Sequence, residues 1–129
     1  MAYYKLLRSS SFCFLVYGYF MDLFIFEGGI MRETGKNGFQ SRLIKDISER
    51  FPGVIIMKND PNYLQGIPDL IILYNDKWAT LEVKKDILAK HQPNQDYYVE
   101  KMNSMSYSTF VYPENEEEVL NDLEKVFQS

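Results

Sequence analysis

Cysteine and histidine are almost absent from this 129-residue chain, since each occurs once, as Cys13 and His91. A single cysteine excludes an intrachain disulfide and a metal site built from cysteine thiolates. Disulfides belong to oxidising compartments, so their exclusion favours an intracellular protein. We therefore expect the chain in the cytoplasm.

Positive charge is scarce as well. The chain has 14 Lys and Arg against 18 Asp and Glu, a net charge of −4 and an isoelectric point of about 5.0. It lacks the broad basic surface with which proteins grip nucleic acid non-specifically. An enzyme acting on nucleic acid would then need locally gathered positive charge, or metal ions. Lys84, Lys85, Lys90 and His91 supply one local cluster, while much of the negative charge lies far along the chain, at 114–118.

A long uninterrupted hydrophobic run is also missing. Residues 12–26 are strongly apolar and aromatic, but Gly18 and Asp22 interrupt them. The run is shorter than the roughly 18 to 20 residues that a transmembrane helix needs. Lys5 and Arg8 precede it, as in a signal peptide, but no small-residue cleavage site follows. We therefore expect no stable membrane association.

Residues 1–30 have another interpretation. Residues 27–29 are Glu-Gly-Gly, which purine-rich codons readily encode. Such codons can contain a bacterial ribosome-binding sequence, and here it would lie just upstream of the start codon for Met31. We expect Met31 to be the true start and residues 1–30 to be a mistranslated leader, or else a disordered, apolar extension. If translation starts at Met1, a membrane-peripheral or partner-binding segment becomes the better interpretation. In either case residues 31–129 are long enough for a single domain with a modest core.

The most informative stretch is a predicted β-hairpin. Residues 69–74 form a continuous apolar run rich in strand formers, and residues 77–85 run back as a second strand. Between them lies Asn75-Asp76, a pair that tolerates left-handed backbone geometry in turns. The start of the first strand should therefore lie near the end of the second.

Three polar residues stand at that end of the hairpin. Glu82 and Lys84 are two apart, so their side chains leave the same face of the strand, and Asp69 opens the facing strand. Carboxylate oxygens suit Mg²⁺, and the carbonyl of Val83 is a further oxygen ligand. A neighbouring ammonium can orient water or stabilise developing negative charge. In the plainer alternative, Asp69 is a turn residue, and Glu82 and Lys84 form an ordinary solvated strand face.

These residues resemble a known motif. Pro68-Asp69, twelve intervening residues and Glu82-Val83-Lys84 resemble the PD-(D/E)XK nuclease motif. The opening Gly66-Ile-Pro-Asp and the later Gln95 resemble its VRR-NUC and Holliday-junction-resolvase-like branch, in the small single-domain form common in phages. The resemblance covers roughly residues 39–124. It implies a chain encoded by a phage or prophage and working in the bacterial host cell.

The resemblance also implies roles for individual residues. Asp69 and Glu82, with the Val83 carbonyl, would hold Mg²⁺ or Mn²⁺, and Lys84 would orient or polarise the attacking water. Gln95 would assist the water or the phosphate. The family's first helix usually carries a metal-directed Glu, and the matching position here is Gln40, which lacks the charge. Gln40 would assist through its amide oxygen, through a water or by touching the substrate, or else be a solvated residue of the first turn. Other candidates for substrate contact come from the flanking loops: Lys58, Asn59, Tyr63, Gln65, Gly66, Lys85, Lys90 and His91.

The remaining pattern predicts an α/β fold. Residues 32–38 should be a loose lead-in, and the hairpin should be flanked by elements at 39–50 (helix), 54–57 (strand), 93–105 (helix), 108–112 (strand) and 116–127 (helix). This order predicts a mixed sheet with helices packed on it. It is also the αβββαβα order of the restriction-endonuclease-like core that the resemblance implies.

We therefore expect a metal-dependent DNA endonuclease that hydrolyses phosphodiester bonds. The resemblance suggests branched or flap DNA as the substrate and a homodimer as the working form. The alternative is a non-catalytic DNA- or protein-binding module on the same fold. The chain has Asp69, Glu82 and Lys84 together. This favours the enzyme, because a non-catalytic relative would not need all three.

Overall fold

The structure, a computed structural model, describes residues 34–129, so the expectations for residues 1–30 lie outside the described residues. Among the helices of residues 34–129, none is long and apolar enough to cross a membrane. The elements follow one another in this order: α3 (Gly35–Arg50), β1 (Ile55–Lys58), β2 (Leu70–Tyr74), β3 (Lys77–Val83), α4 (Gln95–Met105), β4 (Tyr107–Val111), the short 3-10 helix η1 (Pro113–Asn115) and α5 (Glu116–Gln128). The predicted αβββαβα order is confirmed.

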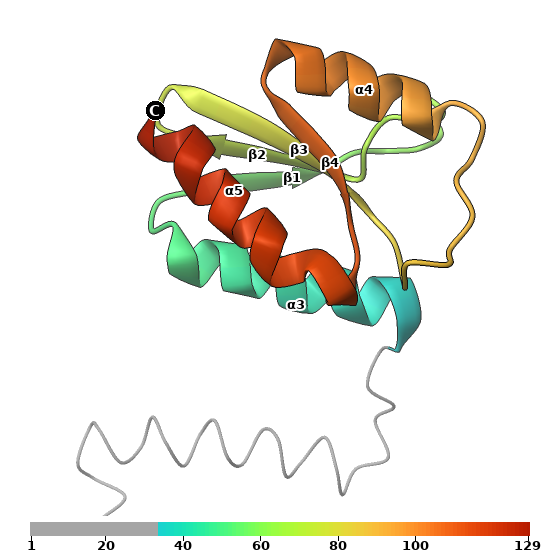
Figure 1. The fold of residues 1–129 in the computed structure, drawn as a ribbon, viewed down its shortest axis with the longest axis horizontal. Helices are drawn as coiled ribbons and strands as arrows, with labels where there is room; N and C mark the ends of the chain where they lie inside the picture. Colours follow the sequence, from blue (N-terminus) through green and yellow to red (C-terminus); the bar gives the residue numbers. More distant parts are fainter. Residues whose placement is uncertain (1–33) are drawn as a thin grey trace, which may run out of the picture. The chain divides into compact units, whose positions relative to one another are not determined.

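The four strands form one mixed sheet in the order β1-β2-β3-β4 (Figure 1). β1, β2 and β3 are joined antiparallel, and β4 runs parallel to β3. Asn75 turns the β2–β3 hairpin with a φ of 54°, a left-handed value that asparagine tolerates. The parallel pair needs a crossover connection, which α4 supplies.

The two faces of the sheet differ in chemistry. On β3, Ala79, Leu81 and Val83 belong to the main hydrophobic core, as period-2 alternation requires. α3 and α5 pack onto this face from below the sheet in Figure 1 and add to the same core Phe39, Leu43, Ile47, Val119, Leu120, Leu123 and Phe127.

The opposite face of β3 meets α4 and carries polar groups. Thr80 donates a hydrogen bond to Ser108 of β4, with an Oγ1–Oγ distance of 2.7 Å, and both residues are buried. Glu82 lies on this same face because it is two residues from Thr80. The hairpin therefore presents Glu82 toward α4 rather than toward the apolar core.

The first helix begins four residues earlier than predicted. The prediction of a loose lead-in over 32–38 was wrong for 35–38, since α3 starts at Gly35. Gly35, with a φ of +76°, is the first residue of α3, and Gly38 is buried within its first turns. The added turn extends α3 and brings Lys36 into the ordered fold.

Candidate active site

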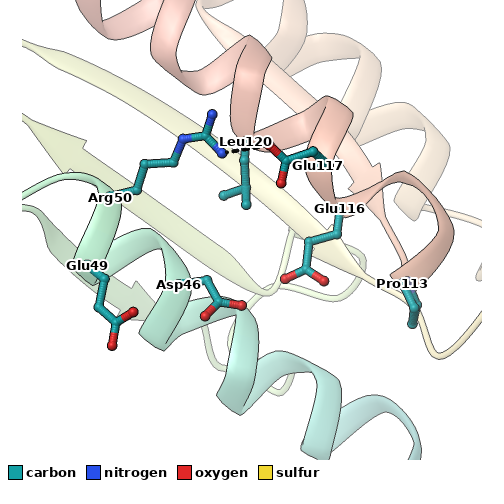
Figure 2. Close-up of a pocket in the computed structure, with 7 residues that line it drawn as sticks. All are labelled: Asp46, Glu49, Arg50, Pro113, Glu116, Glu117 and Leu120. Atoms are coloured by element: carbon teal, nitrogen blue, oxygen red, sulfur yellow. Dashed lines mark hydrogen bonds and ion pairs between the residues drawn. The ribbon is translucent and has the colours of Figure 1, made fainter.

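A pocket of about 570 Å³ lies between the end of α3 and the start of α5 (Figure 2). Its lining is mostly acidic: Asp46, Glu49, Arg50, Pro113, Glu116, Glu117 and Leu120. Its cation, Arg50, is held by Glu117 at 3.1 Å and Glu124 at 2.9 Å. Burial, and then the charge of Asp46, raise the pKa of Glu116. Such a lining repels phosphate, and none of its residues has a predicted catalytic role.

The hairpin register places Asp69 beside Glu82. Leu70 pairs with Leu81, so Asp69, one residue earlier, lies opposite Glu82, one residue later. The backbone N–H of Val83 donates to Asp69 Oδ2 at 2.9 Å, which fixes the orientation of this carboxylate. The two carboxylates therefore share one end of the hairpin, where the spacing in the sequence placed them.

Glu82 is the more buried of the two carboxylates. Its side chain is only 1% exposed, while that of Asp69 is 24% exposed. Burial is the main cause that raises the pKa of Glu82 to about 7, and the neighbouring charge of Asp69 adds to it. The ammonium groups of Lys36 and Lys84 act in the opposite direction. The carboxylate pair thus sits in surroundings that favour an added cation.

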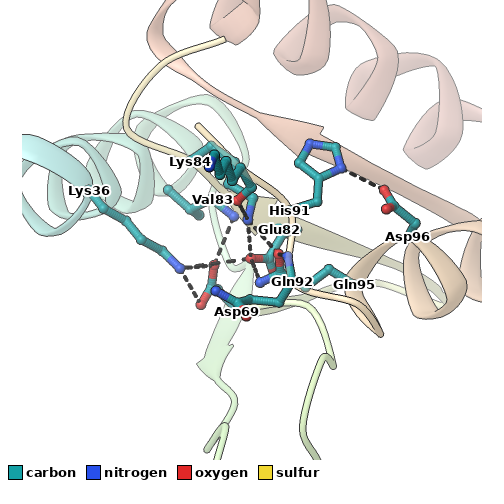
Figure 3. A network of polar contacts seen from close by, with 10 residues as sticks. Lys36, Asp69, Glu82, Val83, Lys84, His91, Gln92, Gln95 and Asp96 are labelled. Atoms are coloured by element: carbon teal, nitrogen blue, oxygen red, sulfur yellow. Dashed lines mark hydrogen bonds and ion pairs between the residues drawn. The ribbon is translucent and has the colours of Figure 1, made fainter. Parts of the chain in front are cut away.

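Lys84 follows β3 and is almost buried, with 8% of its side chain exposed. Its backbone N–H donates to Val111 at 2.8 Å, which extends the contact between β3 and β4. Its ammonium donates to the carbonyl of Lys90 at 3.2 Å and to Gln95 Oε1, and it lies 3.6 Å from Glu82 Oε1. These contacts hold the charge of Lys84 at the carboxylate pair (Figure 3).

Gln95, the first residue of α4, links Lys84 to Glu82. Its Oε1 accepts hydrogen bonds from Lys84 and from the backbone N–H of Gln92, and its Nε2 donates to Glu82 Oε1 at 2.6 Å. Because its oxygen has two donors and its nitrogen an acceptor, the amide has one favoured orientation. Gln95 thus lies within the cluster and bridges its cation and its buried carboxylate.

Sequence reasoning missed Lys36. Its ammonium lies 2.8 Å from Asp69 Oδ2 and 3.8 Å from Glu82 Oε1 (Figure 3). The signal was present in the sequence, because Lys36 lies one helical turn before Gln40 and shares its helix face. Gln40 itself is partly buried, and within residues 34–129 no hydrogen bond joins it to Asp69, Glu82 or Lys84.

Two loops close around this cluster. Asn59 donates its backbone N–H to the Asp69 carbonyl at 2.8 Å and its side-chain amide to the Pro68 carbonyl at 2.7 Å. Gly66 has a φ of +91°, and a Cβ on it would lie 2.4 Å from the Cβ of Asn94. Only glycine therefore lets the loop before Asp69 approach the turn that precedes Gln95.

A solved structure described as a VRR-NUC domain is similar to this chain, with a TM-score of 0.50 and 26% sequence identity. The match covers 63% of this chain and 92% of that one. This likeness supports the VRR-NUC nuclease family for the chain. It also confirms the predicted restriction-endonuclease-like fold and indicates a nuclease domain of the PD-(D/E)XK type. No family model and no curated protein matches the sequence.

The side chains of the remaining candidates for substrate contact lie outside the hydrogen bonds of this cluster, although the backbone carbonyl of Lys90 accepts one from Lys84. His91 stacks on Phe110 with ring centroids 3.9 Å apart, and its Nδ1 lies 2.6 Å from Asp96 Oδ1. Tyr63 is 90% exposed. The side chains of the others are also exposed: Lys58, Gln65, Lys85 and Lys90. These residues are placed where a large substrate could reach them.

The carboxylates of the cluster are of the kind that can hold a divalent ion. Within residues 34–129, no group of three or more His, Cys, Asp and Glu side chains could hold a metal. Mg²⁺ keeps several waters and commonly takes only one or two carboxylates, which Asp69 and Glu82 supply. The ammonium of Lys36 already lies within 4 Å of both carboxylates, so this place attracts a cation. The donors present therefore suit Mg²⁺ or Mn²⁺.

Proposed function

We propose that this chain is a metal-dependent nuclease that hydrolyses phosphodiester bonds within DNA. The observation that carries the proposal is the convergence of Asp69, Glu82 and Lys84 at one end of the hairpin, on a fold like that of a VRR-NUC domain. Asp69, Glu82 and the Val83 carbonyl would hold Mg²⁺ or Mn²⁺. The bound ion would supply Lewis acidity, which withdraws charge from phosphate oxygens and acidifies water.

Hydrolysis forms a bond between a water oxygen and phosphorus and breaks the bond from phosphorus to one sugar oxygen. The water loses a proton and the departing oxygen gains one, which leaves a phosphate monoester and a free hydroxyl. Lys84 is suited to orient that water and to stabilise the negative charge that develops on the phosphate. Its ammonium needs no large movement for this, since Gln95 and the Lys90 carbonyl already hold it beside Glu82.

The surroundings of the cluster favour a polynucleotide as the substrate. The cluster lies at the sheet end where the loops before β2 and after β3 meet. Exposed lysines and an exposed tyrosine lie in those loops or, for Lys58, at the adjoining end of β1. Lys58, Lys85 and Lys90 would pair with phosphates, and Tyr63 could stack on a base. Branched or flap DNA is the form that the family likeness favours.

The test is cleavage of labelled linear, flap and four-way-junction DNA by the full chain, with Mg²⁺, Mn²⁺ or a chelator. Lys84→Met keeps the buried stem of the side chain and removes the ammonium. We expect metal-dependent cutting to fall at least about a hundredfold in this variant, as when a charge-stabilising donor is lost. Lys77→Met is the matched control, since Lys77 begins the same strand and pairs only weakly with Asp76, at 3.9 Å.

Absence of cutting by the unmodified chain on every substrate would contradict the proposal. So would equal cutting by Lys84→Met. A titration with Mn²⁺ then separates the enzyme from a non-catalytic binding module. The enzyme should have a Mn²⁺ site that disappears in Asp69→Asn, and a binding module should not.

A further inference from the structure

Lys36 pairs with the same oxygens that the proposed metal site uses. Its ammonium lies 2.8 Å from Asp69 Oδ2, 3.0 Å from Asp69 Oδ1 and 3.8 Å from Glu82 Oε1. A divalent ion on these oxygens would be a second cation only a few ångströms away. The two cations repel each other, so they compete for the carboxylates.

The position of Lys36 on its own helix does not account for these contacts. It lies in the first turn of α3, where the positive end of the helix dipole disfavours a cation. That turn contains no acidic residue. Lys45, on the same helix, pairs instead with Glu49 one turn away, at 3.8 Å. The carboxylates of the hairpin are therefore what hold the ammonium of Lys36.

We propose that Lys36 is a tethered competitor of the divalent metal, which sets the metal affinity of the site and must leave Asp69 and Glu82 when the metal binds. The inference rests on the proposed function, because it takes Asp69 and Glu82 as the metal ligands. The side chain of Lys36 is 39% exposed, so its ammonium can withdraw toward solvent without disturbing the core. The phosphate of a bound substrate offers it a new partner at the same place.

The test measures Mn²⁺ binding to the full chain without substrate, by the loss of the electron paramagnetic resonance signal of free Mn²⁺. Lys36→Gln removes the competing charge and keeps a polar side chain of similar length. Like charges a few ångströms apart repel enough, even in water, to correspond to about tenfold in affinity. We expect Lys36→Gln to bind Mn²⁺ about tenfold more tightly than the unmodified chain.

Lys45→Gln is the matched control, because it removes the same charge from the same helix at a position 75% exposed. Its Mn²⁺ affinity should stay within about twofold of the unmodified chain, since salt screens charges beyond about 10 Å. Lys36→Arg keeps the charge and should not gain affinity. Circular dichroism of each variant establishes that it is folded before the titration.

Equal or weaker Mn²⁺ binding by folded Lys36→Gln would overturn the role of Lys36. If Mn²⁺ binding still disappears in Asp69→Asn, the metal site and the proposed function stand, and only the role of Lys36 is lost. If neither the unmodified chain nor Lys36→Gln binds Mn²⁺ and neither cuts DNA, the proposed function fails and this inference fails with it. The two failures therefore give different results.

Discussion

Gly66 is the most demanding backbone position next to the candidate site. A Cβ added there would lie 2.4 Å from Asn94 Cβ, 2.8 Å from its carbonyl carbon and 3.0 Å from its carbonyl oxygen. Two of these three atoms are backbone, so no rotamer change relieves the contact. The φ of +91° adds a conformational strain that an alanine side chain would feel even in open space.

Gly53 separates these two effects. Its φ of +88° is nearly the same, but a Cβ on Gly53 would meet nothing within 4 Å. Gly53→Ala should therefore cost only the left-handed strain, about 1–2 kcal/mol in the free energy of unfolding. Gly66→Ala carries the same strain and a backbone clash of the overpacking kind, which adds about 1–3 kcal/mol.

The assay is urea unfolding of both variants, followed by circular dichroism. The slope for a domain of this size is about 1 kcal/mol per molar urea, so the midpoint of Gly66→Ala should fall about 1–3 M below that of Gly53→Ala. Folded Gly66→Ala should also cut DNA more slowly, because its loops carry Asp69 and lead into Gln95. Equal midpoints for the two variants would refute the reasoning.

Two further predictions concern parts of the fold away from the cluster. Thr80→Val leaves the buried Ser108 hydroxyl without its 2.7 Å partner and should lower the free energy of unfolding by about 1–3 kcal/mol, measured in urea, while Thr80→Val with Ser108→Ala should recover part of that loss. Burial, and then the charge of Asp122, raise the pKa of Tyr107 well above its usual value. The unfolded chain therefore loses this proton first, and stability should fall as the pH rises above about 10. Tyr107→Phe should flatten that fall in urea midpoints taken at pH 8 and pH 10.5, and an unchanged slope would contradict the assignment.

The part of the site that could be predicted from the sequence is the part that the hairpin register fixes. Asp69 and Glu82 meet because Leu70 pairs with Leu81, and that pairing follows from the turn at Asn75 and Asp76. In a short hairpin the turn fixes the register of the two strands, so few alternative pairings remain once the turn is recognised. The element order was predictable for the same reason, since the apolar periodicity of each element is local.

The contacts that escaped prediction depend on packing between distant segments. Lys36 reaches Asp69 across 33 positions of sequence, from a helix whose start was hidden by Gly35 and Gly38. Asn59 was predicted as a candidate for substrate contact, yet its side chain donates to the carbonyl of Pro68. The position of Lys36 one turn before Gln40 indicates only that the two share a helix face. Its contact with Asp69 and the contact of Asn59 with Pro68 arise only when helix, loop and hairpin pack together.

Gln95 shows why a neutral residue belongs between two charged ones. Lys84 lies 3.6 Å from Glu82 Oε1, too far for a direct hydrogen bond, and Gln95 donates to Glu82 while accepting from Lys84. With the amide between them, the ammonium and the carboxylate lie side by side without a direct hydrogen bond, and Gln95 holds both. The same cluster therefore combines a buried lysine with a carboxylate pair, the combination that the proposed phosphodiester hydrolysis would use.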